Sequence, residues 1–179
     1  MDATGFSAKT YARWYDPRPT RRSRREWLKL HAAVTCVLKA IPSMEVTDGE
    51  VSDSPQLGAL LSTLPLDNVE AVTADAGYLS RRNCDLIAAI GAKPYIRLKR
   101  NIRSRGHGSS AWTSMILEWR RNPKAWNKRY HARSSAETAF SVIKRRFGYK
   151  LMSIRRDLQR KELMTKVIAY NLNILAKLN

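Results

Sequence analysis

The stretch YHARSSAETAFSVIK, residues 130–144, holds a single acid, Glu137, in a segment rich in helix-forming and basic residues. On an ideal helix with 100° per residue, four of its polar side chains project within an arc of roughly 60°: Tyr130, Arg133, Glu137 and Lys144. Next to this arc lies an apolar stripe that consists of Ala136, Ala139, Phe140, Ile143 and Phe147. Such a stripe is typical of a helix face that packs on a core. A carboxylate placed in this way can be a salt-bridge partner, or it can be a metal ligand beside anion-binding side chains.

The chain has 179 residues, and its net charge of +18 is unevenly distributed. Residues 1–26 carry +4, residues 27–96 carry −3, residues 97–133 carry +10 and residues 134–179 carry +7. Two basic flanks around a mildly acidic middle indicate a polyanion bound to particular faces, and they favour nucleic acid as the partner. A membrane surface is the weaker alternative, because no basic segment has a clean Trp, Phe and Leu face.

Length favours one domain, residues 1–179, and the apolar content of 44% suits a packed globule. No apolar run approaches the ~20 residues that span a bilayer, and the first residues lack the apolar core of a signal peptide. Cys36 and Cys84 have no spacing typical of a zinc site, and we expect both to be reduced and buried in a cytoplasmic protein.

The residue patterns predict an ordered series of strands and helices. In chain order these are two strands within residues 23–49 with a turn near 36–39, a helix over 54–63, a buried strand over 69–75, a helix within 80–92 closed by Gly91, a strand over 94–98, a basic flexible loop over 99–110, a helix over 111–121 broken by Pro123, the helix of Glu137, and a terminal helix over 157–178. Asp53 and Asp157 are predicted to cap the helices that follow them, and support of a functional site is the lesser alternative for Asp53.

This order indicates a mixed α/β fold. The strands over 69–75 and 94–98 are joined by one helix, which predicts a right-handed parallel crossover unit. Ligands of such sheets collect outside the carboxyl ends of the strands, and Asp75 lies at one of those ends.

Three acids stand out, and each has an ordinary explanation when it is taken alone. Asp75, in TADAGY, can be a turn residue that bonds its own backbone. Asp2 can belong to a frayed terminus, and Glu137 can be an intrahelical partner of Arg133.

Together these residues resemble the catalytic domain of the DDE transposases of bacterial and archaeal insertion sequences. Asp2 lies in an Asp-x-Thr-Gly motif, and Asp75 lies in Ala-Asp-x-Gly-Tyr after a buried strand. The spacing Tyr-x2-Arg-x3-Glu-x6-Lys over residues 130–144 matches the Y-R-E-K signature of that family at all four positions. The segments WLKLHAAVT and VSDSPQL are similar to the family as well, so the resemblance covers nearly the whole chain.

The resemblance implies a ribonuclease H-like mixed sheet flanked by helices. It implies that Asp2, Asp75 and Glu137 are the catalytic residues and hold two Mg²⁺ ions, for which Mn²⁺ can substitute. It also implies cleavage of transposon ends, strand transfer into target DNA, and a homodimer in the active complex. The DNA-binding residues implied by the signature are Tyr130, Arg133 and Lys144.

Two alternatives stay open: a basic DNA-binding remnant without catalysis, and a ribonuclease H-like nuclease that cuts without strand transfer. Trp112, Trp119 and Trp126 recur every seven residues and favour core packing over base stacking. The three histidines, His31, His107 and His131, lack ligand spacing.

In a ribonuclease H-like fold the first acid lies on the central strand, yet only Met1 precedes Asp2. The resemblance therefore implies that the beginning of this strand and an upstream DNA-binding region are missing. We expect few ladder hydrogen bonds around Asp2, fraying of this end, and a chain that binds DNA but transposes poorly.

Overall fold

The structure, a computed structural model, describes residues 1–8, 26–65, 69–99, 102 and 108–178. Its strands are β1 (Asp2–Ala8), β2 (Glu26–Ala33), β3 (Ser43–Asp48), β4 (Ala71–Ala74), β5 (Lys93–Ile96) and β6 (Lys150–Leu151). Its α-helices are α1 (Gln56–Ser62), α2 (Arg81–Ala89), α3 (Ser110–Arg121), α4 (Pro123–Tyr130), α5 (Ser134–Phe147) and α6 (Arg156–Leu175). Two short 3₁₀ turns are η1 (Ala76–Tyr78) and η2 (His131–Arg133). Most of the predicted basic loop, including His107, lies outside the described residues.

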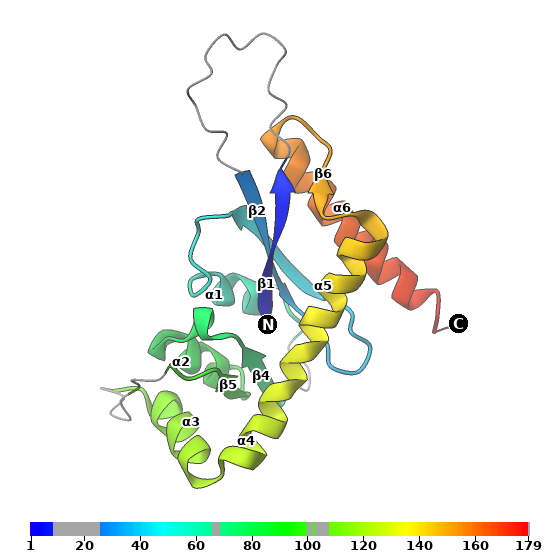
Figure 1. Cartoon of the computed structure of the whole chain (residues 1–179). Helices are drawn as coiled ribbons and strands as arrows, with labels where there is room; N and C mark the ends of the chain where they lie inside the picture. Colours follow the sequence, from blue (N-terminus) through cyan, green and yellow to red (C-terminus); the bar gives the residue numbers. More distant parts are fainter. Residues whose placement is uncertain (9–25, 66–68, 100–101, 103–107, 179) are drawn as a thin grey trace.

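The described strands form two sheets (Figure 1). The larger has the order β3-β2-β1-β6, in which β1 is antiparallel to β2 over its whole length and parallel to β6. The smaller consists of β4 and β5, which are parallel and are joined through α2. The predicted parallel unit is thus confirmed, and the mixed α/β architecture agrees with the predicted ribonuclease H-like fold.

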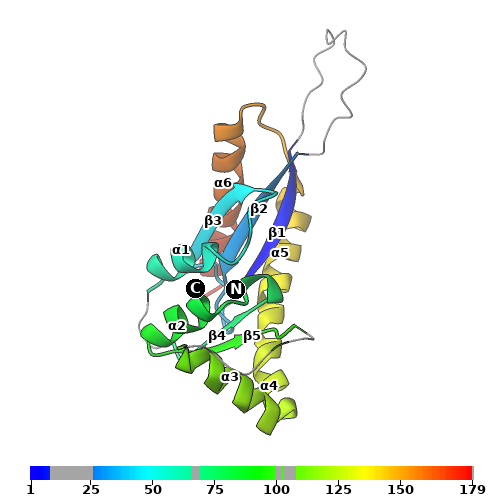
Figure 2. The same ribbon diagram turned by 90° about the vertical axis from the view of Figure 1, so that its left-hand side faces the viewer.

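Two apolar cores hold the helices against these sheets (Figure 2). Helices α5 and α6 pack on the four-stranded sheet through residues that include Phe6, Leu30, Phe140, Ile143, Leu163 and Val167. Helices α1 to α4 surround β4 and β5 in a second core. Trp112 and Trp126 are buried in that core and Trp119 packs against it, which confirms the prediction of core packing for the three tryptophans.

The two sheets meet at the beginning of β1. The amino group of Met1 donates a hydrogen bond to the carbonyl oxygen of Thr73 in β4. Asp2 pairs with Ala32 of β2 in the ladder, and Met1 and Asp2 are only 7% and 9% exposed. The fraying that we expected at Asp2 is therefore not observed, because burial and the β2 ladder fix this end of the strand.

Both predicted aspartate caps are wrong. Helix α6 begins at Arg156, so Asp157 lies inside its first turn, where it pairs with Arg155. Helix α1 has no side-chain cap, because the Asp53 carboxylate instead accepts a hydrogen bond from Lys29 Nζ at 3.0 Å. A charge-assisted bond to a lysine competes well with a neutral backbone donor.

The predictions for Gly91 and Pro123 at helix ends are confirmed. Gly91 has φ of 77° just after α2, as a glycine in the C′ position should. Pro123 separates α3 from α4 and takes the first helical position of α4, and Asn122 accepts the Ala125 backbone N–H.

Cys84 is buried as predicted. Cys36 is exposed, contrary to prediction, because it lies in the turn that projects between β2 and β3.

His31 of β2 ties the larger sheet to the turn that follows β4. Its Nδ1 lies 3.0 Å from the Tyr78 hydroxyl of η1, and its Nε2 lies 2.9 Å from Thr47 Oγ1 of β3. The ring is fully buried, and this burial lowers the pKa of His31 to about 4. His31 is therefore neutral at physiological pH.

We predict that the free energy of unfolding falls as the pH drops from 6.5 toward 4. In this range the unfolded chain takes up a proton at His31 and the folded chain does not, so the stability present above pH 6.5 is lost. A shift of this size corresponds to about 3 kcal/mol. Urea unfolding at a series of pH values tests it. His31→Gln should flatten the slope and His131→Gln, at an exposed position, should not; an unchanged slope in His31→Gln contradicts the prediction.

Candidate active site

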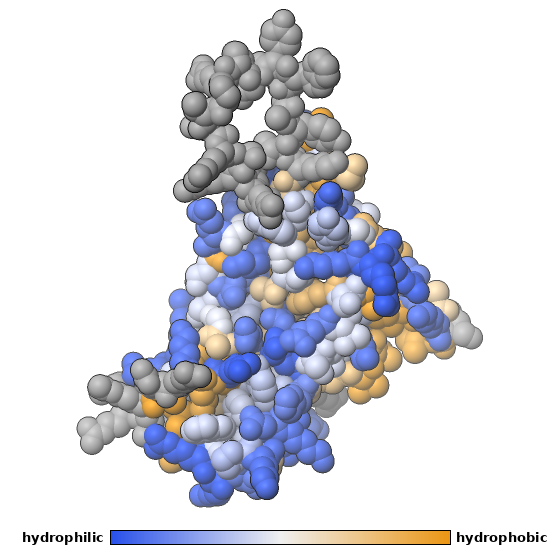
Figure 3. Space-filling model, in the orientation of Figure 1, coloured by the Kyte–Doolittle hydropathy of each residue, from blue (hydrophilic) through white to orange (hydrophobic). Residues whose placement is uncertain are grey.

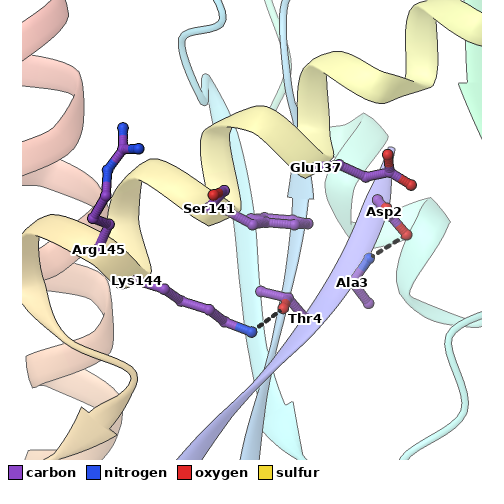
Figure 4. A pocket seen from close by; sticks show the side chains of 8 residues that line it. Asp2, Ala3, Thr4, Glu137, Ser141, Lys144 and Arg145 are labelled. Atoms are coloured by element: carbon purple, nitrogen blue, oxygen red, sulfur yellow. Dashed lines mark hydrogen bonds between the residues drawn. The ribbon is translucent and has the colours of Figure 1, made fainter.

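A groove of about 590 Å³ runs between β1 and α5 (Figure 4). Its lining includes Asp2, Thr4, Glu137, Ser141, Lys144 and Arg145. Asp2 and Thr4 share a face of β1 because strand side chains alternate, and Glu137, Ser141 and Lys144 share a face of α5 because they are spaced by four and three residues. The carboxylates of Asp2 and Glu137 lie beside each other at one end of the groove.

Arg133 joins the two carboxylates. Its Nη1 donates to Asp2 Oδ2 at 2.6 Å and its Nη2 donates to Glu137 Oε1 at 2.5 Å. The side chains of Arg133 and Asp2 are 16% and 13% exposed, whereas that of Glu137 is 56% exposed. The salt-bridge alternative for Glu137 is therefore realised, and it includes a second acid from the opposite end of the chain.

The charges at this point influence one another. Burial raises the pKa of Asp2 and the charge of Asp75 raises it further, while the charge of Arg133 lowers it. Burial lowers the pKa of Arg133, but Asp2 and the other neighbouring negative groups raise it more, so the net shift is upward. Arg133 is therefore firmly protonated between the acids.

Asp75 follows β4 and immediately precedes η1, as the sequence predicts. It is half-buried, its side chain makes no capping hydrogen bond, and its backbone carbonyl accepts the Tyr78 N–H at 3.0 Å. Its charge raises the pKa of both Asp2 and Arg133. Within the described residues, however, no three acidic, histidine or cysteine side chains are grouped closely enough to hold a metal ion.

Tyr130 is buried, although the helical spacing groups it with Arg133, Glu137 and Lys144. It ends α4, and the 3₁₀ turn η2 separates it from α5, so the 100° per residue of a single α-helix does not apply. Its ring is stacked on Trp126 with centroids 5.4 Å apart, and its hydroxyl is buried with no hydrogen-bond partner among the described residues. The Arg133 guanidinium carbon lies 5.8 Å from the centre of the Tyr130 ring, so the ring supports the arginine.

Lys144 occupies the groove as predicted. Its Nζ donates to Thr4 Oγ1 at 2.7 Å, and burial lowers its pKa. Thr4, Ser141 and Arg145 are groove residues that were not predicted. Strand alternation from Asp2 identifies Thr4, and helical spacing from Glu137 identifies Ser141, so both could have been found from the sequence.

A family model described as "Transposase DDE domain" matches residues 1–172. The chain belongs to this DDE transposase domain family. No solved structure matches it. Members of the family act on DNA and are generally dependent on divalent metal ions. Within the part of the DDE domain that the structure describes, no helix is long and apolar enough to cross a membrane.

The acids of this DDE domain fit a divalent metal in donor type and in charge. Asp2, Asp75 and Glu137 offer only carboxylate oxygens, which hard cations such as Mg²⁺ prefer. Asp2 and Glu137 share the single positive charge of Arg133, and the charge of Asp75 acts on the same guanidinium, so negative groups are in excess here. Arg133 stands between Asp2 and Glu137 in this structure.

We predict that Arg133→Ala lowers the free energy of unfolding by about 2–3 kcal/mol, because it leaves the buried Asp2 without a counter-charge. Arg155→Ala, which removes an exposed ion pair, should leave stability unchanged within error. Urea unfolding is also measured for Arg133→Ala in a chain that carries Asp2→Asn. In that chain Arg133→Ala should lower the free energy of unfolding by less, since the main partner of Arg133 is already neutral. Equal costs in both backgrounds would contradict the bridge.

Proposed function

We propose that this chain is a transposase catalytic domain that cleaves transposon ends and transfers the freed strand into target DNA. The observation that carries the proposal is the convergence of Asp2 and Glu137 on Arg133, whose pKa is also raised by the charge of Asp75. These residues come from β1, from the turn after β4 and from the first turn of α5. Family membership supports the same reaction class.

Asp2, Asp75 and Glu137 would hold the divalent ions, two Mg²⁺ or Mn²⁺ in their place. Such ions supply activation of the attacking oxygen and stabilisation of the leaving oxygen in in-line phosphoryl transfer. The task of the chain is to hold these carboxylates close together. Arg133 does this for Asp2 and Glu137 by placing a positive charge between them.

The positively charged side chains of Arg133, between the acids, and Lys144, in the groove, would position the DNA. Arg133 can exchange its carboxylate partners for a phosphate, which its planar guanidinium binds with two parallel hydrogen bonds. Lys144 lies two helical turns along α5 from Glu137 and offers a point charge to a neighbouring phosphate. The ring of Tyr130 packs against the Arg133 guanidinium and would support it in this role.

The partners that we propose are transposon-end and target DNA, met in the cytoplasm, and a second copy of the chain in the active complex. The basic regions favour DNA. Helix α6 offers a surface for a second copy, because it leaves Met164, Ile168, Leu172 and Leu175 between 42% and 59% exposed. This apolar surface lies beside the C-terminal end of the chain in Figure 3.

A second candidate function is DNA binding without catalysis. It is favoured by two observations: Arg133 lies between Asp2 and Glu137, and no group of three metal-ligand side chains is assembled in the described residues. A nuclease of the same fold that lacks strand transfer is distinguished by the products, because it releases cut ends and joins none.

We predict that Glu137→Gln abolishes Mg²⁺-dependent cleavage of transposon-end DNA, a loss greater than the 10- to 100-fold that outer-shell changes typically cause. DNA affinity should be unchanged or slightly higher, since one negative charge is lost. The matched control is Glu50→Gln, which removes the same charge at an exposed loop. Cleavage by Glu137→Gln at the parental rate would exclude Glu137 as a ligand.

DNA binding should weaken steeply with salt. If the basic regions neutralise six or more phosphates, the slope of log affinity against log salt should be about −5 or steeper. Lys144→Ala should reduce the steepness by about one, and Lys177→Ala, at the distant end of the chain, should leave it unchanged. Fluorescence anisotropy across a salt series measures the three slopes; equal slopes for Lys144→Ala and the parent would remove Lys144 from the interface.

A further inference from the structure

A polar cluster lies behind the turn that carries Asp75. Asp53, from the loop before α1, accepts a hydrogen bond from Lys29 Nζ of β2 at 3.0 Å. The same carboxylate lies against the backbone of Gly77 in η1: a Cβ added there would be 2.5 Å from Asp53 Oδ2. Glycine is needed at this position for space. Asp53 therefore touches the turn from the side of the larger sheet.

A second set of contacts holds the end of the same turn. The Thr47 hydroxyl donates to the carbonyl of Asp48 at 3.2 Å, so its oxygen is free to accept the Nε2–H of His31. His31 Nδ1 then accepts the hydroxyl proton of Tyr78. With this arrangement the bonds run in one direction, from Tyr78 through His31 to Thr47, and both ring nitrogens of His31 have a partner.

The cluster contains one charged pair. Asp53 Oδ1 lies 3.8 Å from His31 Nδ1, but burial lowers the pKa of His31 to about 4, so the imidazole carries no charge at pH 7. The charge partner of Asp53 is Lys29. Burial raises the pKa of Tyr78, and the charges of Asp53, Asp2 and Asp75 raise it further, so its phenol stays protonated and lies among the acids.

These contacts act on Asp75 through the backbone. The Tyr78 N–H donates to the Asp75 carbonyl at 3.0 Å, and the Leu79 N–H donates to the Ala76 carbonyl at 3.3 Å. A side chain that fixes Tyr78 or Gly77 thereby fixes the residue three or two positions earlier. Apolar residues of similar volume would fill this space at no loss of stability, which is often the case for buried polar groups. The polar atoms instead give the turn one defined position.

We propose that Asp53, His31 and Tyr78 are positioning residues that hold the turn from Asp75 to Tyr78 against the larger sheet, so that Asp75 faces Asp2 and Glu137. The inference rests on the proposed function in one respect only, which is that Asp75 is a metal ligand. That Asp53 and Tyr78 hold the turn stands independently of any metal.

Tyr78→Phe and Asp53→Asn test the proposal in the full chain. Both keep the side-chain volume and remove one polar function each. Two matched controls make the same chemical changes elsewhere: Tyr149→Phe at an exposed ring, and Asp48→Asn at a carboxylate paired with arginines of α6. Hydrogen exchange is measured at the amides of Tyr78 and Leu79, and Mn²⁺ affinity is measured by electron paramagnetic resonance.

Both test variants should exchange these two amides faster, bind Mn²⁺ about 10- to 100-fold more weakly, and bind DNA like the parent. The controls should match the parent in all three. Unchanged exchange in both test variants overturns the holding of the turn. Faster exchange with parental Mn²⁺ affinity overturns the positioning role. A parent chain that binds no Mn²⁺ contradicts the proposed function, and the exchange result then decides the holding of the turn on its own.

Discussion

The bridge from Arg133 to Asp2 and Glu137 is the interaction on which the candidate site depends. It joins the first strand to the first turn of α5, although 135 positions separate the two acids in the chain. Two carboxylates repel each other, and one of these is mostly buried, so they remain neighbours only with a cation between them. A guanidinium also matches the geometry of phosphate, so we propose Arg133 as the residue at which DNA and the acids compete.

The third acid is held by different means. Asp75 begins a backbone turn, and contacts of Tyr78, His31 and Asp53 hold this turn in position. The described strands of the two sheets form no ladder with each other, so the bond from Met1 to Thr73 and side-chain contacts join them instead. The site thus combines an electrostatic bridge in the groove with a polar support behind it, and each can be weakened separately.

Local spacing explains what could be predicted from the sequence. Glu137 and Lys144 lie within the reach of helical periodicity, and Asp75 lies where a buried strand ends, so their elements were predicted correctly. The 3₁₀ turn that holds Arg133 and the burial of Tyr130 against Trp126 were not predicted, because packing decides both. Contacts between segments far apart in the chain explain why the predicted cap at Asp53 is wrong. The partners of Asp53, Lys29 and Gly77, lie 24 positions before and after it.

The most direct test of the account is to locate the metal itself. Fe²⁺ is added in place of Mg²⁺ in the presence of transposon-end DNA. Ascorbate and peroxide then generate hydroxyl radicals at the bound ion. Mass spectrometry locates the cuts that these radicals make in the protein backbone. The account predicts cuts beside Asp2, Asp75 and Glu137 together, suppressed by excess Mg²⁺. Cuts confined to one of these segments, or found elsewhere in the chain, would contradict a shared metal site.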